Sequence, residues 1–352
     1  MAGTERTDFS LCPRRGARLF FLGLVLVATM VAAAGTGAVA VPPGEIIRIV
    51  LGKILLKKFG VGDIAPLHES IVMAARLPRV LLAALVGGGL AAAGVVLQAL
   101  FRNPLADPYL IGASSGAALG GCVAILTFPG ATVGPFSTLP VFAFAGALGA
   151  VVLVFGLARE ASGLVVERLL LAGIAVGSSL GALVSLLVFL SGDRLHPLIY
   201  WLLGSLSARN WGHVAMALPY TLGALFMALL FVRELNGLLL GEEEARYLGI
   251  EVEKVKKALL AAAALLTATA VAAAGPVGFV GLIIPHITRQ FLGADHRILL
   301  PGAVLAGAAF LVGADLVART IIAPGEMPVG IITAACGGPF FAYLLWRRRR
   351  AF

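Results

Sequence analysis

Residues 80–100 read VLLAALVGGGLAAAGVVLQAL, an uninterrupted run of 21 residues in which Gln98 is the one polar side chain. A membrane core about 30 Å thick needs about 20 apolar residues in helical form to cross it. Gly and Ala are typical of transmembrane helices that pack closely, because lipid supplies no hydrophobic force for helix association. The run therefore predicts a membrane-spanning helix.

Nine further segments on either side of this run have similar length and polarity. They are 19–41, 109–128, 138–158, 169–191, 214–232, 258–275, 276–294, 299–318 and 328–346. Composition agrees, since 60% of the 352 residues are hydrophobic and 13% are charged, whereas a soluble chain carries about 25% charged residues. The sequence predicts an all-α polytopic membrane protein, one transmembrane domain over residues 1–352 with about ten spans.

Two of these segments are atypical. Proline and polar residues interrupt 276–294, at Pro276, Pro285, His286, Arg289 and Gln290. A broken segment is tolerated only against protein or a water-filled cavity. The first segment follows arginines and precedes small residues, as a signal peptide does, but it is longer than a usual signal core. We therefore expect an uncleaved first helix.

The Lys and Arg residues are distributed unevenly between the loops. With a cytoplasmic N-terminus, alternating spans place 18 of the 27 Lys and Arg residues inside and nine outside. Cytoplasmic loops of membrane proteins carry such an excess. The sequence predicts that both termini are cytoplasmic, and the same bias explains the net charge of +9 without a nucleic-acid partner.

Two segments between the spans stand out. Residues 42–79 are predicted to be external, and 44–59 within them have the pattern of an amphipathic helix lying on the membrane surface, with Ile46, Ile47, Val50 and Ile54 on one side. The longest cytoplasmic loop, 233–257, is rich in charge and is punctuated by glycines. It is either a docking surface for a partner or a solvated loop.

Several kinds of chemistry are missing from the sequence. None of the six lysines is followed by Ser or Thr, which excludes a Walker A phosphate loop. The histidines and the three cysteines have no metal-ligand spacing, and we interpret Cys122 and Cys336 as small packing residues. We expect no catalytic residue, no metal site and no cofactor.

One enzyme-like string has a simpler explanation. Residues 112–116 match the Gly-x-Ser-x-Gly pattern of serine hydrolases, but they fall within a predicted transmembrane helix. Gly112, Gly116 and Gly120 recur every fourth residue, which makes a smooth face for helix packing.

Charged residues within the predicted spans are few. Asp315 has Arg319 four residues later, a spacing that predicts an ion pair within one helix. A pathway with so few charges offers little to couple to an ion gradient, so energy for transport is expected from another subunit. An ion-coupled secondary transporter is the alternative.

Several strings, in this order and spacing, resemble the FecCD family of permeases, which serve importers of ferric siderophores, haem and cobalamin. They are Arg76-Leu77-Pro78-Arg79, Gln98 to Pro108, Leu110-Ile111-Gly112, Ser115-Gly116-Ala117, Tyr200 to Leu206, Leu240-Gly241-Glu242, Leu248-Gly249, Gly275 to Leu282, Pro285-His286, Asp295-His296-Arg297 and Met327 to Gly330. The match extends from about residue 70 to 347.

The resemblance implies the type II permease fold of ABC importers in a bacterial or archaeal plasma (inner) membrane. It implies a homodimer with ten helices per subunit, whose partners are two cytosolic ATP-binding subunits, an extracytoplasmic substrate-binding protein and membrane lipid. Hydrolysis of ATP is expected in the separate subunits. The cargo expected is a metal chelate, either a ferric siderophore, haem or cobalamin.

The resemblance also assigns roles to individual residues. Arg76, Arg79 and Arg319 match the external arginines that receive acidic residues of the binding protein, a task suited to a bidentate guanidinium. Asn103 and Leu105 match a cytoplasmic gate. Coupling to the ATPase is assigned to Leu240, Gly241, Glu242, Glu243, Ala245, Leu248 and Gly249.

One string departs from the family. Small hydroxyl residues precede the Arg-Leu-Leu-Leu-Ala-Gly string in the cobalamin branch, whereas Val166 and Glu167 precede Arg168 here. The details of this second gate element are therefore not carried over to this chain.

Overall fold

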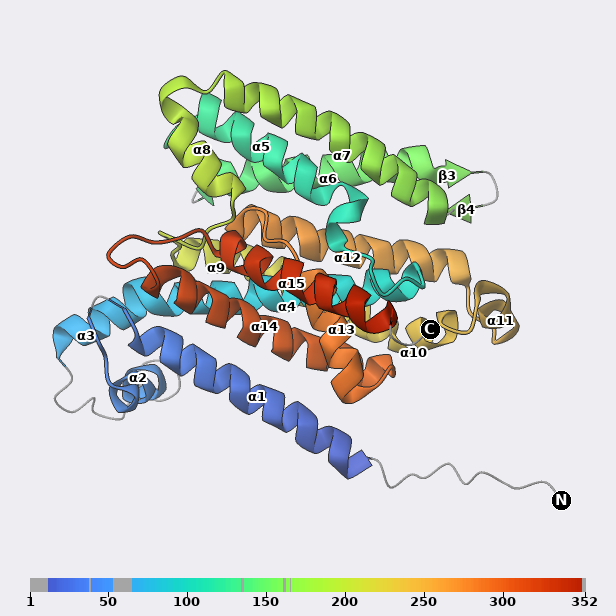
Figure 1. Ribbon diagram of the computed structural model, residues 1–352, viewed down its shortest axis with the longest axis horizontal. Helices are drawn as coiled ribbons and strands as arrows, with labels where there is room; N and C mark the ends of the chain where they lie inside the picture. The colour runs from blue at the N-terminus through green and yellow to red at the C-terminus, as the bar shows by residue number, and fades with distance from the viewer. Residues whose placement is uncertain are drawn as a thin grey trace.

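The computed structural model describes residues 12–37, 39–52, 65–133, 136–160, 163–164 and 166–349. Within these ranges the chain is almost entirely helical, and its long helices lie roughly alongside one another in one bundle (Figure 1). The strands form two short antiparallel hairpins, β1 with β2 and β3 with β4. The all-α membrane fold predicted from the sequence is confirmed.

The elements follow the chain in a simple order. They are α1 (Cys12–Gly35), α2 (Pro43–Val50), α3 (Pro66–Ser70), the π-helix η3 (Ile71–Arg76), α4 (Leu77–Leu100), the 3-10 helix η4 (Pro108–Ile111), α5 (Ala113–Thr127), β1 (Thr132–Val133), β2 (Phe136–Ser137), α6 (Thr138–Ala158), β3 (Arg159–Glu160), β4 (Gly163–Leu164), α7 (Val166–Phe189), the 3-10 helix η5 (Gly192–Arg194), α8 (Leu195–Leu202), α9 (Trp211–Leu230), α10 (Val232–Leu238), α11 (Glu242–Tyr247), α12 (Val252–Ala274), α13 (Val280–Leu292), α14 (His296–Thr320) and α15 (Val329–Arg349).

Each of the ten predicted spans coincides with one of these helices, but their lengths differ. Seven helical stretches in the described residues are long and apolar enough to cross a membrane, and α5 and the apolar part of α15 are shorter. The interrupted segment 276–294 contains α13, whose 13 residues follow an irregular stretch after α12. Since about 20 residues are needed for a full crossing, α13 alone is too short.

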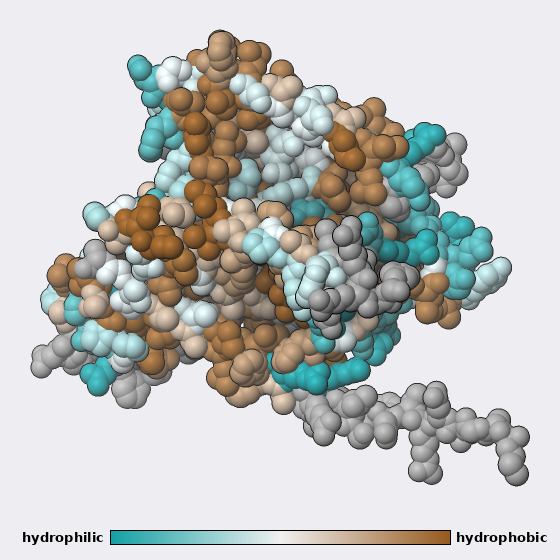
Figure 2. Space-filling model, viewed as in Figure 1, coloured by the Kyte–Doolittle hydropathy of each residue, from teal (hydrophilic) through white to brown (hydrophobic). Residues whose placement is uncertain are grey.

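The loops gather at two opposite ends of the bundle. The β3–β4 hairpin, α10 and α11 lie at one end, on the right in Figure 1, and α3 and α8 lie at the other. The predicted alternation puts the first set inside the cell and the second set outside, and on that prediction the two ends are named the inner end and the outer end. Figure 2 shows apolar side chains over much of the visible flank and polar ones nearer the ends, as expected for a bundle surrounded by lipid.

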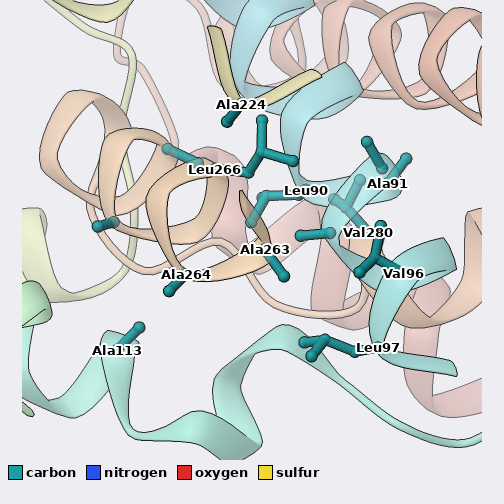
Figure 3. Close-up of a cluster of buried hydrophobic side chains, with 14 of the residues drawn as sticks. Leu90, Ala91, Val96, Leu97, Ala113, Ala224, Ala263, Ala264, Leu266 and Val280 are labelled. Atoms are coloured by element: carbon teal, nitrogen blue, oxygen red, sulfur yellow. The ribbon is translucent and has the colours of Figure 1, made fainter. Parts of the chain in front are cut away.

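The centre of the bundle is formed by α4 and α12. About four-fifths of the membrane-spanning part of each is buried within the chain, whereas the corresponding part of α1 is 11% buried and that of α7 is 17% buried. Leu90 of α4 packs near Leu266 and Ala263 of α12, with Val280 of α13 beside them (Figure 3). Small residues are frequent in both α4 and α12, and they allow neighbouring helices to approach closely.

Close approach of backbones explains the glycines of the third and fourth spans. A Cβ added to Gly116 would lie 2.2 Å from the carbonyl oxygen of Gly146, and one added to Gly120 would lie 2.1 Å from that of Phe142. The packing face predicted from the four-residue spacing is therefore confirmed for these two glycines. Gly112 instead precedes α5 with a φ of 79°, in the left-handed region.

Several smaller predictions are corrected or only partly covered. Of the amphipathic helix predicted over 44–59, the structure describes the first part as α2, which ends at Val50 and in which Ile46 and Ile49 are buried. Ile54 lies outside the described residues. Cys122 is buried as predicted, but Cys336 is exposed. In a membrane-spanning chain, an exposed residue on α15 faces lipid or another protein.

Candidate functional site

The three arginines predicted to dock a binding protein come together at the outer end of the bundle. Arg76 ends η3, Arg79 lies in the first turn of α4, and Arg319 lies in the last turn of α14. All three line one cavity of about 400 Å³, together with Glu326 from the connection between α14 and α15. The structure thus unites residues separated by more than 200 positions.

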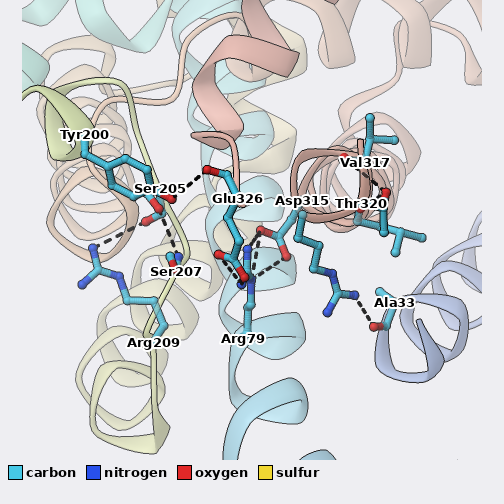
Figure 4. Close-up of polar contacts among 12 residues, drawn as sticks. Ala33, Arg79, Tyr200, Ser205, Ser207, Arg209, Asp315, Val317, Thr320 and Glu326 are labelled. Atoms are coloured by element: carbon cyan, nitrogen blue, oxygen red, sulfur yellow. Dashed lines mark hydrogen bonds and ion pairs between the residues drawn. The ribbon is translucent and has the colours of Figure 1, made fainter. Parts of the chain in front are cut away.

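Arg79 binds two carboxylates at once. Its Nη2 donates to Asp315 Oδ1 at 2.8 Å and its Nη1 donates to Glu326 Oε1 at 2.9 Å (Figure 4). The side chain of Asp315 is 2% exposed and that of Glu326 is 34% exposed. The ion pair predicted within α14 was therefore wrong, because Asp315 pairs with Arg79 of α4 rather than with Arg319.

Arg76 and Arg319 are bound to the end of the first helix. Arg76 Nη1 donates to the carbonyl oxygens of Ala34 at 2.8 Å and Gly35 at 3.0 Å, and Arg319 Nη2 donates to that of Ala33. The last carbonyls of a helix have no partner within the helix, and a cation there also interacts favourably with the helix dipole. Both arginines therefore hold α1 against the rest of the bundle.

Two residues of this cluster were missed by the sequence reasoning. Arg209, just before α9, is half-buried, and burial together with the charge of Arg79 lowers its pKa to about 10. Burial opposes ionisation of Glu326, but hydrogen bonds from Ser207 and Arg79 and the nearby arginine charges outweigh it, so the pKa of Glu326 is lowered. Neither residue could be linked to Arg79 by spacing, because both are distant in sequence.

At the inner end, α11 is a short helix with one buried and one exposed side. Gly241 precedes it with a φ of 135°, which favours glycine. Lys256 of α12 pairs with Glu242 at 2.6 Å, and Ala245 is fully buried. These contacts fix the helix on the bundle.

The other side of α11 presents apolar side chains to solvent. Tyr247 is 91% exposed, Leu240 is 65% exposed and Leu248 is 64% exposed. Glu243 is exposed beside them, as is Gly249, which has a φ of 81°. Exposed apolar groups in a charged loop mark an interaction surface.

A polar contact that the sequence did not predict ties α10 to α14. Asn236 Nδ2 donates to Asp295 Oδ1 at 2.8 Å, and the backbone N–H of His296 donates to Asn236 Oδ1 at 3.0 Å. Asp295 also caps α14 by accepting from the N–H of Arg297. The connection leading to α11 is thereby anchored to the beginning of α14.

The predicted gate residues lie in the turn after α4. The side chain of Asn103 accepts a hydrogen bond from the N–H of Leu105 at 2.9 Å, and Leu105 is 41% exposed. Arg102 before them has a φ of 44°. Before Arg168, where the sequence departs from the family, Glu167 is exposed, and the side chain of Val166 is outside the described part of the chain.

Comparison with known proteins gives a consistent result. A model of the FecCD transport family matches residues 24–347. The chain is 49% identical to the cobalamin import system permease protein BtuC of Halobacterium salinarum, over 82% of this chain and 76% of that protein. It is 47% identical to the hemin transport system permease protein HmuU of Yersinia pestis, over 78% and 82% of the two chains.

A solved structure has the same fold. It shows an inward-facing conformation of an ABC transporter described as metal-chelate type. Its TM-score is 0.80 and its sequence is 34% identical, over 94% of this chain and 98% of the other. The family model covers both the arginine cavity and the α11 surface, which lie within residues 24–347. This chain is therefore a member of the FecCD transport family, a membrane-spanning permease of the ABC importer type.

Proposed function

We propose that this permease carries a metal chelate inward, as the translocating subunit of an ATP-driven importer. A ferric siderophore, a cobalamin or haem is the proposed cargo, by analogy with relatives named for cobalamin and hemin transport. The proposal rests on two surfaces at opposite ends of the bundle, the arginine-lined cavity and the exposed apolar side chains of α11 and its flanks. The arginine cavity suits an acidic partner, and the α11 surface suits a cytosolic one.

The cytosolic partner is proposed to be an ATPase, present in two copies. The sequence has no Walker A loop, so hydrolysis takes place in another chain. The proposed contact consists of residues before, within and after α11. They are Leu240, Gly241, Glu242, Glu243, Ala245, Leu248 and Gly249, to which the structure adds Tyr247 by its exposure.

A second copy of this chain is proposed to complete the pathway. The exposed face of α7 is strongly apolar, with Leu171 67% exposed and Phe189 85% exposed. Such a face must meet either lipid or protein, and a symmetric pair of copies is the commonest oligomer. Asn103 and Leu105 are proposed to close the cytoplasmic end of the pathway between the copies.

The external partner is proposed to be a substrate-binding protein that offers acidic residues to the arginine cavity. Arg76 and Arg319 already hold α1, and Arg79 already holds Asp315. Charge reversal at these arginines would therefore disturb the fold together with docking. A test needs a position that lines the cavity without holding it together.

Ala75 is such a position, because it lines the cavity and is exposed. We expect Ala75→Glu to weaken binding of the binding protein through like-charge repulsion, whereas Ala75→Gln, which has the same size and no charge, binds nearly as tightly as the wild type. Affinity measured against salt concentration should fall as salt rises. Equal affinity for the two variants, without salt dependence, would exclude acidic docking in this cavity.

A further inference from the structure

Four arginines come together at the inner end of the bundle, where α1 begins beside the end of α13 and the beginning of α14 (Figure 1). They are Arg15 and Arg18 of α1, Arg289 of α13 and Arg297 of α14. We name this group the basic surface. None of the roles assigned above uses it.

Direct contacts hold the beginning of α1 against α13 and α14. Arg18 Nη1 donates to the carbonyl oxygen of Phe291 at 2.6 Å, and its guanidinium lies over the Phe291 ring, 5.4 Å from the ring centroid. A Cβ added to Gly302 of α14 would lie 2.1 Å from Leu292 Cδ1 and 3.3 Å from Leu19 Cδ2, so side chains of α13 and α1 fill the space beside α14. The three helix ends therefore form one continuous surface.

Asp295 lies near these arginines, but its carboxylate is already engaged within the fold. Its Oδ1 accepts from Asn236 Nδ2 at 2.8 Å and from the backbone N–H of Arg297 at 3.1 Å. Burial opposes ionisation of Asp295, but these hydrogen bonds and the charges of Arg297 and Arg15 outweigh it, so the pKa of Asp295 is lowered. One carboxylate beside four guanidinium groups leaves the basic surface with an excess of positive charge.

The guanidinium groups lack anionic partners of their own. None of the four arginines forms an ion pair within the described part of the chain. Arg18 and Arg297 are exposed, and Arg15 and Arg289 are half-buried. The planar fork of arginine binds phosphate oxygens bidentately, so a phosphate group would supply the acceptors that the fold leaves out.

An apolar, lipid-facing surface continues from the basic surface along α1. The membrane-spanning part of α1 is 11% buried within the chain. Phe20 is 69% exposed, Leu24 is 52% exposed and Val27 is 58% exposed, and their spacing of four and three residues puts them on one face of the helix. A phospholipid has the same order of groups, with a charged headgroup at the membrane surface and acyl chains below it. Basic groups between helices at the cytoplasmic side are typical sites for anionic headgroups.

We propose that the basic surface binds the phosphate of an anionic phospholipid, with one acyl chain along Phe20, Leu24 and Val27 of α1. The headgroup would bridge the beginning of α1 to α13 and α14, and so add to the contact that Arg18 makes with Phe291. An acidic protein partner fits less well, because these arginines adjoin the lipid-facing side of α1, whereas the surface assigned to the ATPase is formed by α11 and its flanks. The site is independent of the cargo and of the energy source.

Native mass spectrometry of the purified full-length chain in detergent micelles tests the proposal. Phosphatidylglycerol, which is anionic, and phosphatidylcholine, which is zwitterionic, are titrated separately with identical acyl chains, and the affinity for the first bound lipid is measured. We expect phosphatidylglycerol to bind at least about 10-fold more tightly than phosphatidylcholine. Arg15→Gln with Arg297→Gln should weaken phosphatidylglycerol binding about 5- to 25-fold, since one basic residue near an anionic headgroup contributes about 5-fold. Binding of phosphatidylcholine should be unchanged.

Two further double variants separate the site from the net charge and from any effect on folding. Arg246→Gln with Lys257→Gln removes two exposed basic residues at the same end, on α11 and α12, and should leave phosphatidylglycerol binding within about 2-fold of the wild type. Arg15→Lys with Arg297→Lys keeps both charges at the site and should stay within about 3-fold.

Equal affinity of the wild type for the two lipids would overturn the proposal. Equal losses in the two glutamine double variants would also overturn it, because they would show attraction to the net charge alone. A third contrary result is unchanged phosphatidylglycerol binding by the Arg15 and Arg297 glutamine variant together with lost assembly with the ATPase, which would identify the basic surface as a protein contact.

Discussion

Arg79 forms ion pairs with two carboxylates at the outer end of the bundle. It neutralises Asp315, whose side chain is 2% exposed, and it also reaches Glu326 at the rim. A buried charge whose partner is removed is strongly destabilising, because its desolvation is no longer offset. Arg79 is therefore a structural residue as well as a candidate docking residue.

Replacement of Arg79 tests this structural role. We expect Arg79→Leu to destabilise the chain by about 3–5 kcal/mol, because it leaves the buried Asp315 carboxylate unpaired. The double variant Arg79→Leu with Asp315→Leu should regain most of the loss, since neither charge remains. The measurement is reversible unfolding in mixed detergent micelles.

Glu326→Gln provides the matched control in the same assay. Its side chain is 34% exposed, and partly exposed ion pairs contribute little, so its effect should be much smaller than that of Arg79→Leu. Equal losses for the two variants would show that Asp315 does not depend on Arg79.

The sequence reasoning reached the arginines but not their partners. The Arg-x-Pro-Arg string and the charge bias of the loops located Arg76 and Arg79 at an outer helix end. The pairing of Arg79 with Asp315 joins residues 236 positions apart, whereas the local spacing favoured Arg319. Only the packing of α4 against α14 could reveal the true partner.

Among the elements, the pair formed by α5 and α6 packs through glycines at which a side chain would not fit. Gly116 and Gly146 face each other so closely that a Cβ on either would lie within 2.3 Å of the other's carbonyl oxygen. Backbones in this arrangement gain van der Waals contact along the whole helix face. The element-level packing was predictable because the four-residue repeat of glycine is a local pattern.

A methyl group at this contact should separate the two helices. We expect Gly116→Ala to destabilise the chain by about 1–3 kcal/mol, the usual cost of overpacking. Gly149→Ala is the control, because nothing lies within 4 Å of its added Cβ on α6. Thermal unfolding monitored by circular dichroism compares the two, and a loss of similar size in both would contradict the packing explanation.

The short helix α11 is fixed to the bundle on one side, but the apolar side chains of Tyr247 and Leu248 are exposed on the other. We expect the double variant Tyr247→Ala with Leu248→Ala to weaken assembly with the ATPase subunit at least about 10-fold, because apolar anchors dominate interface energies. The chain's own stability should change little, since both side chains are largely exposed.

The surface variant Glu251→Ala serves as the comparison for α11. Glu251 is 69% exposed and pairs with Lys254 at the surface, so assembly should be unaffected. Normal assembly of the α11 variant, measured by co-purification and by microscale thermophoresis, would exclude this face from the coupling contact.

At the scale of the whole molecule, each of the ten predicted spans coincides with a helix, and nine of the ten are long apolar runs, 276–294 being the interrupted one. The sequence did not predict three features: how short α13 is, how exposed α7 is, and how deeply α4 is buried. Hydropathy cannot distinguish a helix in the centre of the bundle from one facing lipid, because both are apolar. The arrangement depends instead on close contacts between helices distant in sequence, such as that of Gly87 in α4 with the carbonyl oxygen of Gly307 in α14.

Orientation in the membrane is a prediction of the whole chain. On a background without native cysteines, Thr132→Cys in the α5–α6 connection should react with an impermeant maleimide added outside intact cells, and Glu243→Cys in α11 should not. Both positions are exposed, so the side of the membrane on which each lies decides whether it is labelled. The reverse pattern would place α11 outside the cell.

The central claim is that ATP, and not an ion gradient, drives uptake through this chain. Asp315, the acidic residue within α14, is engaged by Arg79 and so is poorly suited to relay ions. The most direct test reconstitutes the chain with its ATPase and binding-protein partners in sealed vesicles and follows a radiolabelled chelate. We predict accumulation that requires ATP and persists with ionophores; accumulation without ATP that ionophores abolish would contradict it and identify a secondary transporter.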